Sequence, residues 1–146
     1  MTRVAGEAFE RYINEALEAL VEARSIIEGM GLDKFLSDKR ARFALRYSII
    51  LIVESLADLA LAILEKDFGV MPRSYREAFM LLGEKNVVSP TYVRVMERLA
   101  ALRNMIVHRY WRIDDARIYL EASRGGLDAV EGFIEELRRY ARSRDP

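Results

Sequence analysis

Apolar residues recur every three or four positions along most of the chain, as they do on the buried face of an α-helix. No segment alternates apolar and polar residues between clusters of turn formers, which is the pattern of a half-buried β-strand. Glycines and prolines break the helical pattern into separate stretches. The pattern predicts five helices: residues 6–28, 37–67 and 74–85, a fourth from Pro90 that ends between His108 and Trp111, and a fifth from Asp114 or Asp115 to about Arg142.

Residues that favour helix ends mark several of these boundaries. Ser37 or Asp38 can cap the start of the second helix with a side-chain oxygen. Ser74 lies three residues before Glu77, which is the spacing of a capping box at the start of the third helix. The glycine pair at 125–126 lowers helix propensity by roughly 1 kcal/mol per glycine. This pair predicts a bend or a close helix contact within the last helix.

The second predicted helix is apolar on nearly every side from Phe43 to Leu64. Glu54 and Asp58 lie within this stretch, and a central carboxylate costs roughly 2.5–3.5 kcal/mol to insert into a membrane. We therefore expect a central helix of a bundle, or one partly in a subunit interface, and no membrane span. The connections are short, so the expected fold is all-α: one domain, residues 1–146, in an up-and-down bundle of four long helices and one short helix.

The composition narrows the possible chemistry. The chain has no cysteine, which excludes disulfides, thiolate metal sites and a cysteine nucleophile, and fits a reducing cytoplasm. Its first residues contain no apolar signal-peptide core. The formal net charge is zero, so no global field attracts nucleic acid. Residues 94–112, however, hold five arginines and a single acid, Glu97. This local excess predicts a basic patch for phosphates, or alternatively a solvated helix face paired with acids elsewhere.

His108, the only histidine of the chain, lies within this basic stretch. A histidine can give and take a proton near neutral pH. Asn104 precedes it by four residues, so the two side chains share one helix face. The long side chain of Arg103 can reach the same place, and a guanidinium suits a phosphate oxygen. The alternative is that a lone histidine near a helix end only packs or caps.

Tyr110 and Trp111 follow the histidine and could stack on bases, or could plug the helix end against the core. The sequence has no Glu-x-x-His pair for a metal site in a bundle, no Gly-x-Ser-x-Gly elbow and no Gly-x-x-x-x-Gly-Lys phosphate loop. Glu54 and Asp58 need partners if they are buried. We expect them to pair with arginine, and a position beside the His108 site is the alternative.

The string Arg103-Asn104-x-x-x-His108-x-Tyr110 resembles the signature of HEPN-fold ribonucleases, and specifically of HepT-like toxins. The resemblance covers most of the chain, from the second predicted helix to the fifth. Further residues that carry it are Glu54, Asp58, residues 71–79, residues 110–114 and Tyr119.

This resemblance implies a HEPN-like helical fold and a metal-independent endoribonuclease without a cofactor, acting as the toxin of a toxin–antitoxin pair. It implies that Arg103, Asn104 and His108 are the catalytic residues. The implied partner is a small nucleotidyltransferase antitoxin of the MntA type. That antitoxin would silence the toxin by adding AMP to a tyrosine, which corresponds here to Tyr110.

Cleavage of RNA by its own 2′-hydroxyl needs a base on that hydroxyl, an acid on the leaving oxygen and donors for the charge on the phosphorus. One chain offers a single histidine, so we expect a homodimer that supplies two copies of His108. Arg103 would bind the scissile phosphate, and Asn104 would orient His108 or the phosphate. The alternatives are a non-catalytic nucleotide- or substrate-binding module acting with a nucleotidyltransferase, and a structural protein whose second helix forms an interface.

Overall fold

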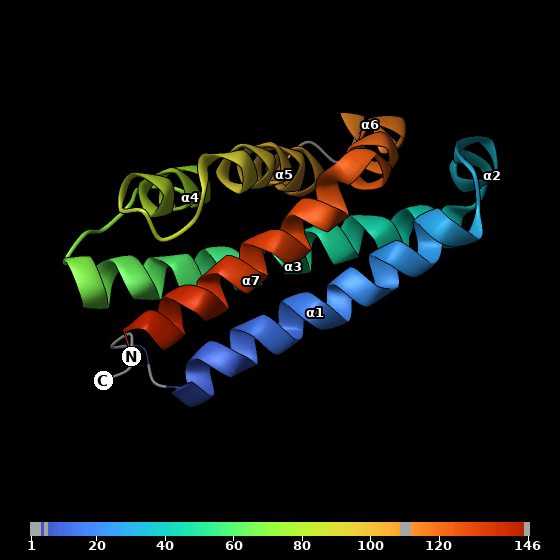
Figure 1. The fold of residues 1–146 in the computed structure, drawn as a ribbon. Coiled ribbons are helices and arrows are strands. Elements are labelled where there is room, and N and C mark those ends of the chain that lie inside the picture. The colour runs from blue at the N-terminus through green and yellow to red at the C-terminus, as the bar shows by residue number, and fades with distance from the viewer. Residues whose placement is uncertain (1–3, 5, 109–111, 145–146) are drawn as a thin grey trace.

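The structure is a computed structural model that describes residue 4, residues 6–108 and residues 112–144. These residues form helices and no strand, which confirms the predicted all-α class. Figure 1 shows long helices running side by side, with the start of the first and the end of the last at the same end of the bundle. In chain order the elements are α1 (Gly6–Gly29), α2 (Leu32–Ser37), α3 (Lys39–Phe68), α4 (Tyr75–Glu84), α5 (Pro90–His108), α6 (Asp115–Glu121), the π-helical η2 (Ala122–Gly126) and α7 (Leu127–Ser143).

The central element is α3, which contacts α1, α2, α4, α5 and α6. By length and composition alone it could cross a membrane, but 61% of its most apolar window is buried inside the bundle. Such a buried fraction is expected of a core helix, and this agrees with the central bundle helix predicted from the sequence. The apolar side chains that form the centre of the core, each with 0% exposure, include Leu45, Ile49, Ile52, Leu56, Leu59 and Ile63.

Helix ends form where the cap residues predict them. The Asp38 side chain accepts a hydrogen bond from the Ala41 amide at 3.0 Å, so Asp38 rather than Ser37 caps α3. The Ser74 hydroxyl accepts from the Glu77 amide at 3.0 Å, which confirms the capping-box spacing at α4. These bonds satisfy amides that have no partner within the helix itself.

Two features differ from the five predicted helices. The short helix α2 occupies what the sequence pattern left as a linker, because six residues are too few to show a period. Its Phe35 is fully buried and packs against Tyr119, with the ring centroids 5.1 Å apart. The last predicted helix is divided by η2, at the predicted glycine bend. Gly125 has φ +99°, and a Cβ on Gly126 would lie 2.3 Å from a backbone oxygen, so both positions favour glycine.

Candidate functional site

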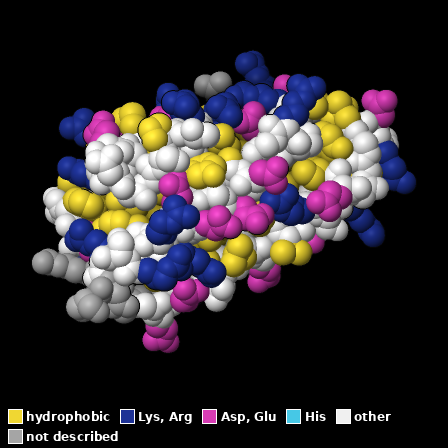
Figure 2. Space-filling model, viewed as in Figure 1, with side chains coloured by type: hydrophobic (Ala, Val, Ile, Leu, Met, Phe, Trp, Pro, Cys, Tyr) yellow, Lys and Arg dark blue, Asp and Glu magenta, His cyan; other side chains and the backbone are white. Residues whose placement is uncertain are grey.

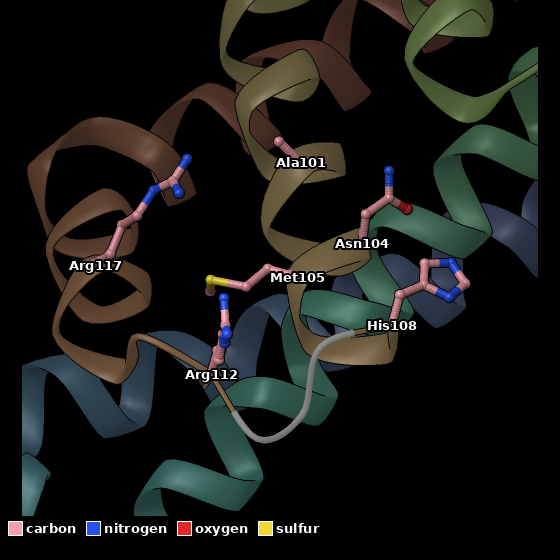
Figure 3. Close-up of a pocket in the computed structure, with 6 residues that line it drawn as sticks. All are labelled: Ala101, Asn104, Met105, His108, Arg112 and Arg117. Carbon is pink, nitrogen blue, oxygen red and sulfur yellow. The ribbon is translucent and has the colours of Figure 1, made fainter.

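The last turns of α5 present the predicted Asn104 and His108 on the surface. Leu102 and Ile106 anchor this part of the helix in the core, with exposures of 1% and 7%. Asn104 and His108 are exposed and project from the same side of the helix (Figure 3). The predicted one-face arrangement of these two side chains is therefore present. An imidazole and an amide placed together in solvent can both reach a bound ligand.

Both residues line a pocket of about 620 Å³, within the usual range for ligand sites. Met105 projects from α5 toward Arg112, while Arg117 reaches over from α6 (Figure 3). Arg112 belongs to the basic stretch of residues 94–112, whereas Arg117 was not predicted, because no periodic signal links residues on two different helices. The described residues that line it are Ala101, Asn104, Met105, His108, Arg112 and Arg117, and none of these is a carboxylate.

Arg103 lies beside this pocket but does not line it. Its Nε and Nη2 donate to Oε2 of Glu54 at 3.1 and 2.7 Å, and its Nη1 donates to the Asn104 side-chain oxygen at 3.2 Å. The guanidinium also lies 5.1 Å from the centre of the Tyr75 ring, a distance at which a cation is attracted to an aromatic face. The expected pairing of Glu54 with arginine is confirmed, and the pair borders the site through Asn104.

Asp58 and Tyr75 extend this group of side chains toward α4. The Tyr75 hydroxyl donates to Oδ1 of Asp58 at 3.5 Å. Partial burial, followed by the negative charge of Glu54, raises the pKa of the Asp58 carboxyl. Burial, followed by the charge of Asp58, also raises the pKa of the Tyr75 hydroxyl. Asp58 therefore bonds a tyrosine rather than the arginine expected from the sequence.

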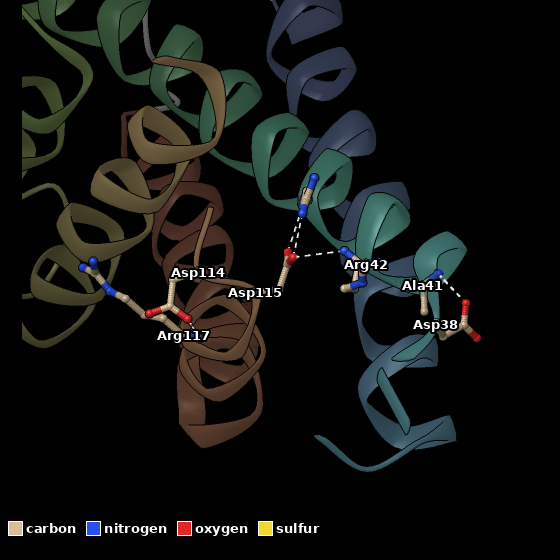
Figure 4. Close-up of polar contacts among 7 residues, drawn as sticks. Asp38, Ala41, Arg42, Asp114, Asp115 and Arg117 are labelled. Carbon is tan, nitrogen blue, oxygen red and sulfur yellow. Dashed lines mark hydrogen bonds and ion pairs between the residues drawn. The ribbon is translucent and has the colours of Figure 1, made fainter. Parts of the chain in front are cut away.

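The position of α6 depends on two neighbouring aspartates with different roles. Asp114 accepts a hydrogen bond from the Arg117 amide at 3.1 Å and caps the helix. Asp115 is only 9% exposed and accepts two bonds from Arg46 on α3, at 2.8 and 2.6 Å. Arg42 lies 3.5 Å away on the same carboxylate (Figure 4). These contacts fix the helix that carries Arg117 to the core helix.

Lys and Arg side chains gather along the edge of the molecule over α5 and α6 (Figure 2). No three carboxylate or histidine side chains lie close enough to hold a metal ion in the part of the chain that the structure describes. Tyr110 and Trp111, which the sequence analysis singled out, fall outside the described residues.

Exposed apolar side chains lie on the same helices as the site. Phe43 and Tyr47 on α3 are 49% and 61% exposed, and Val107 on α5 is 40% exposed. Tyr47 precedes Glu54 by seven residues, two helical turns, so both lie on one side of α3. Exposed apolar side chains therefore lie on the two helices that carry Glu54 and Arg103.

Comparisons with known proteins agree with this picture. The model of the family "Ribonuclease HepT-like" matches residues 16–137. A tRNA nuclease HepT of Aphanizomenon flos-aquae (strain 2012/KM1/D3) is 27% identical over 113 residues, which cover 77% of this chain and 76% of that protein.

Two solved structures share the fold. The cytosolic protein YutE of Bacillus subtilis has a TM-score of 0.83 at 19% identity, covering 98% of this chain and 94% of that one. The tri-AMPylated HEPN toxin of Shewanella oneidensis, solved in complex with its MNT antitoxin, has a TM-score of 0.81 at 20% identity, covering 92% and 98%. These values establish a common all-α architecture.

Proposed function

Because the chain belongs to the HepT-like ribonuclease family, we propose that it is a metal-independent endoribonuclease toxin of the HEPN type that cuts RNA at His108. The observation that carries the proposal is the geometry at the end of α5. The exposed side chains of His108 and Asn104 lie together there, in a pocket whose described lining contains no carboxylate. The tRNA nuclease HepT relative supports RNA as the substrate. We place the reaction in the cytoplasm.

In the proposed reaction, the ribose 2′-oxygen forms a bond to phosphorus and the bond from phosphorus to the 5′-oxygen breaks. One His108 imidazole takes the proton of the 2′-hydroxyl as general base. A protonated imidazole gives a proton to the leaving 5′-oxygen as general acid. The products are a 2′,3′-cyclic phosphate and a free 5′-hydroxyl, so no water, metal or cofactor enters the balance.

A histidine in each of the two roles requires two copies of His108, and one chain supplies one. We propose that a homodimer brings two copies of His108 together. The exposed Phe43, Tyr47 and Val107 support this, because apolar surface of this kind is commonly covered in an interface. These three side chains lie on α3 and α5, the helices that carry Glu54 and Arg103.

In the proposed site, Arg103 stabilises the negative charge that develops on the phosphorus oxygens. Its guanidinium has five N–H donors, and its Nε and Nη2 are held by Glu54. Glu54 thereby fixes the side chain, while Asn104 bonds Arg103 and lies on the His108 side of the helix. From this position between Arg103 and His108, Asn104 orients the phosphate or the imidazole.

We propose that a nucleotidyltransferase antitoxin of the MntA type silences this chain by transferring AMP to Tyr110. The structural neighbours support such a partner, since they include a tri-AMPylated HEPN toxin with an MNT antitoxin. In the sequence Tyr110 stands two residues from both His108 and Arg112. An added phosphate and base would exclude RNA by size and by charge.

A direct cleavage assay tests the enzymatic assignment. The full chain is incubated with end-labelled RNA in EDTA, and the products are separated on a gel. We expect wild-type protein and the exposed control Arg40→Ala to cut, and His108→Ala and Arg103→Ala to lose at least about a hundredfold in rate. Cleavage by both site variants at the wild-type rate would remove the catalytic assignment. Nucleotide binding without any product would favour the non-catalytic module instead.

Two further measurements separate the parts of the proposal. Light scattering at micromolar concentration should give the mass of a dimer, and a monomer would remove the shared site. After coexpression with a nucleotidyltransferase antitoxin, intact mass should rise by whole AMP units that map to Tyr110. Unchanged modification of Tyr110→Phe would place the AMP elsewhere.

A further inference from the structure

Arg112 and Arg117 differ from the other arginines around the site in having no carboxylate partner among the described residues. Arg103 is bound by Glu54 at 2.7 Å, and Arg98 by Glu121 at 2.5 Å. Arg112 and Arg117 are exposed and line the same pocket, whose described lining contains no acid. This pocket therefore holds two arginines that have no ion-pair partner among the described residues, although Asp114 and Glu121 lie beside Arg117 in a neighbouring pocket.

We infer that Arg112 and Arg117 form a binding subsite for a phosphodiester of the RNA backbone that flanks the scissile phosphate. This inference rests on the proposed ribonuclease function. His108 and Asn104 project from one side of α5, and the two arginines lie beyond Met105 on the other side (Figure 3). A strand with its reacting phosphate at His108 would therefore place a neighbouring phosphate near the arginines.

The chemistry of the pocket fits a nucleic-acid backbone. Phosphate contacts from arginine fix the register of a strand without reading its sequence. A guanidinium can donate two parallel hydrogen bonds to phosphate oxygens. Met105 separates the two polar sides and offers a polarizable thioether, which packs well against an aromatic base. The volume of about 620 Å³ leaves room for part of a strand.

The subsite is held in place before a ligand arrives. Arg117 lies in the first turn of α6, whose start is capped by Asp114. The ion pairs of Asp115 with Arg46 and Arg42 then fix this helix to α3. A phosphate that binds there would not have to displace a carboxylate. At Arg103, by contrast, Glu54 already occupies two of the donors.

The test uses RNA binding under conditions in which no cleavage occurs. The full chain carrying His108→Ala is titrated into a fluorescein-labelled single-stranded RNA of about 12 nucleotides, and anisotropy is followed. Salt is varied between about 50 and 200 mM, because each phosphate contact contributes roughly 0.7 to the log–log slope for single strands. Adding Arg112→Ala and Arg117→Ala should flatten the slope by about 0.7, because the proposed subsite neutralises one phosphate.

A second variant with the same change of charge provides the control. Arg11→Ala with Arg40→Ala removes two exposed arginines that lie outside the pocket and outside the basic stretch of residues 94–112. We expect this control to change the log–log slope by less than half as much as the Arg112→Ala, Arg117→Ala variant does. Equal slopes for the two double variants would overturn the inference, because the effect would then be that of net charge. Unchanged RNA binding with loss of the nucleotidyltransferase complex would assign the surface to the antitoxin and also overturn it.

Cleavage by the chain with His108 intact gives an independent readout. On the longer RNA, the Arg112→Ala, Arg117→Ala variant should lose about tenfold or more in kcat/KM, as expected for lost charged hydrogen bonds. On a dinucleoside monophosphate, which has only the scissile phosphate, its difference from wild type should shrink to about twofold. Equal losses on both substrates would overturn the flanking position. Absence of cleavage by wild-type protein would overturn the ribonuclease, while the anisotropy result would still decide the phosphate subsite.

Discussion

Asp115 holds α6 against α3, and its substitution should cost more stability than any exposed carboxylate nearby. It is 9% exposed and bonds Arg46 at 2.8 and 2.6 Å, with Arg42 at 3.5 Å. The bond to Asp115 raises the pKa of the Arg46 guanidinium above its ordinary value. Asp115→Ala would leave two guanidinium groups, on side chains 20% and 26% exposed, facing a cavity. Nε of Arg42 is already buried without a hydrogen-bond partner among the described residues.

Removing one partner of a buried ion pair costs about 3–5 kcal/mol. The lower end applies to Asp115→Ala, because both arginines keep some access to water; we expect about 3 kcal/mol. Asp115→Asn retains an oxygen that can accept one hydrogen bond and should cost about 2 kcal/mol. For a chain of this length, 3 kcal/mol corresponds to a fall in Tm of roughly 6–12 °C.

Urea denaturation followed by circular dichroism measures these losses, at one protein concentration because dimerisation would shift the apparent stability. Asp114→Ala is the matched control: it is the neighbouring residue, it is exposed, and removal of its cap should cost about 1 kcal/mol. A loss for Asp115→Ala that does not exceed the loss for Asp114→Ala would refute the reasoning.

Three further variants probe other contacts. The folded-state pKa of Asp58 is raised, so ionising it opposes folding; Asp58→Asn should therefore be stabilising near pH 7, with the gain disappearing as the pH falls below about 4, and thermal melts that show the opposite trend would contradict this. Gly132→Ala would place a Cβ 2.4 Å from the Tyr92 ring and should cost about 1–3 kcal/mol in urea titrations, part of which the added substitution Tyr92→Leu should restore. Glu54→Gln keeps an oxygen that can accept from Arg103 but removes the compensating charge, so it should steepen the log–log salt dependence of RNA binding by roughly 0.7; an unchanged slope would contradict this.

Local sequence signals predicted those parts of the fold that depend on contacts between residues close in sequence, such as the helix caps. Asp38 and Ser74 cap helices because a side-chain oxygen two or three residues before a free amide can reach it, whatever the rest of the chain does. The same signals failed for α2, whose six residues are held by the burial of Phe35 against Tyr119. That contact joins residues far apart in sequence, so no local pattern reveals it.

The difference between local and distant contacts also explains which parts of the candidate site the sequence predicts. Asn104 and His108 share a face because they are four residues apart on one helix, and this spacing was sufficient to predict them together. The environment of Arg103 depends on Glu54, which is 49 residues away, and the position of Arg117 depends on an ion pair that spans 69 residues. These distant contacts decide where unpaired positive charge remains. Among the described residues at the site, Glu54 compensates Arg103, whereas Arg112 and Arg117 have no ion-pair partner. If the proposed subsite is correct, an arginine five residues before a histidine is therefore not by itself the first group that an approaching phosphate meets.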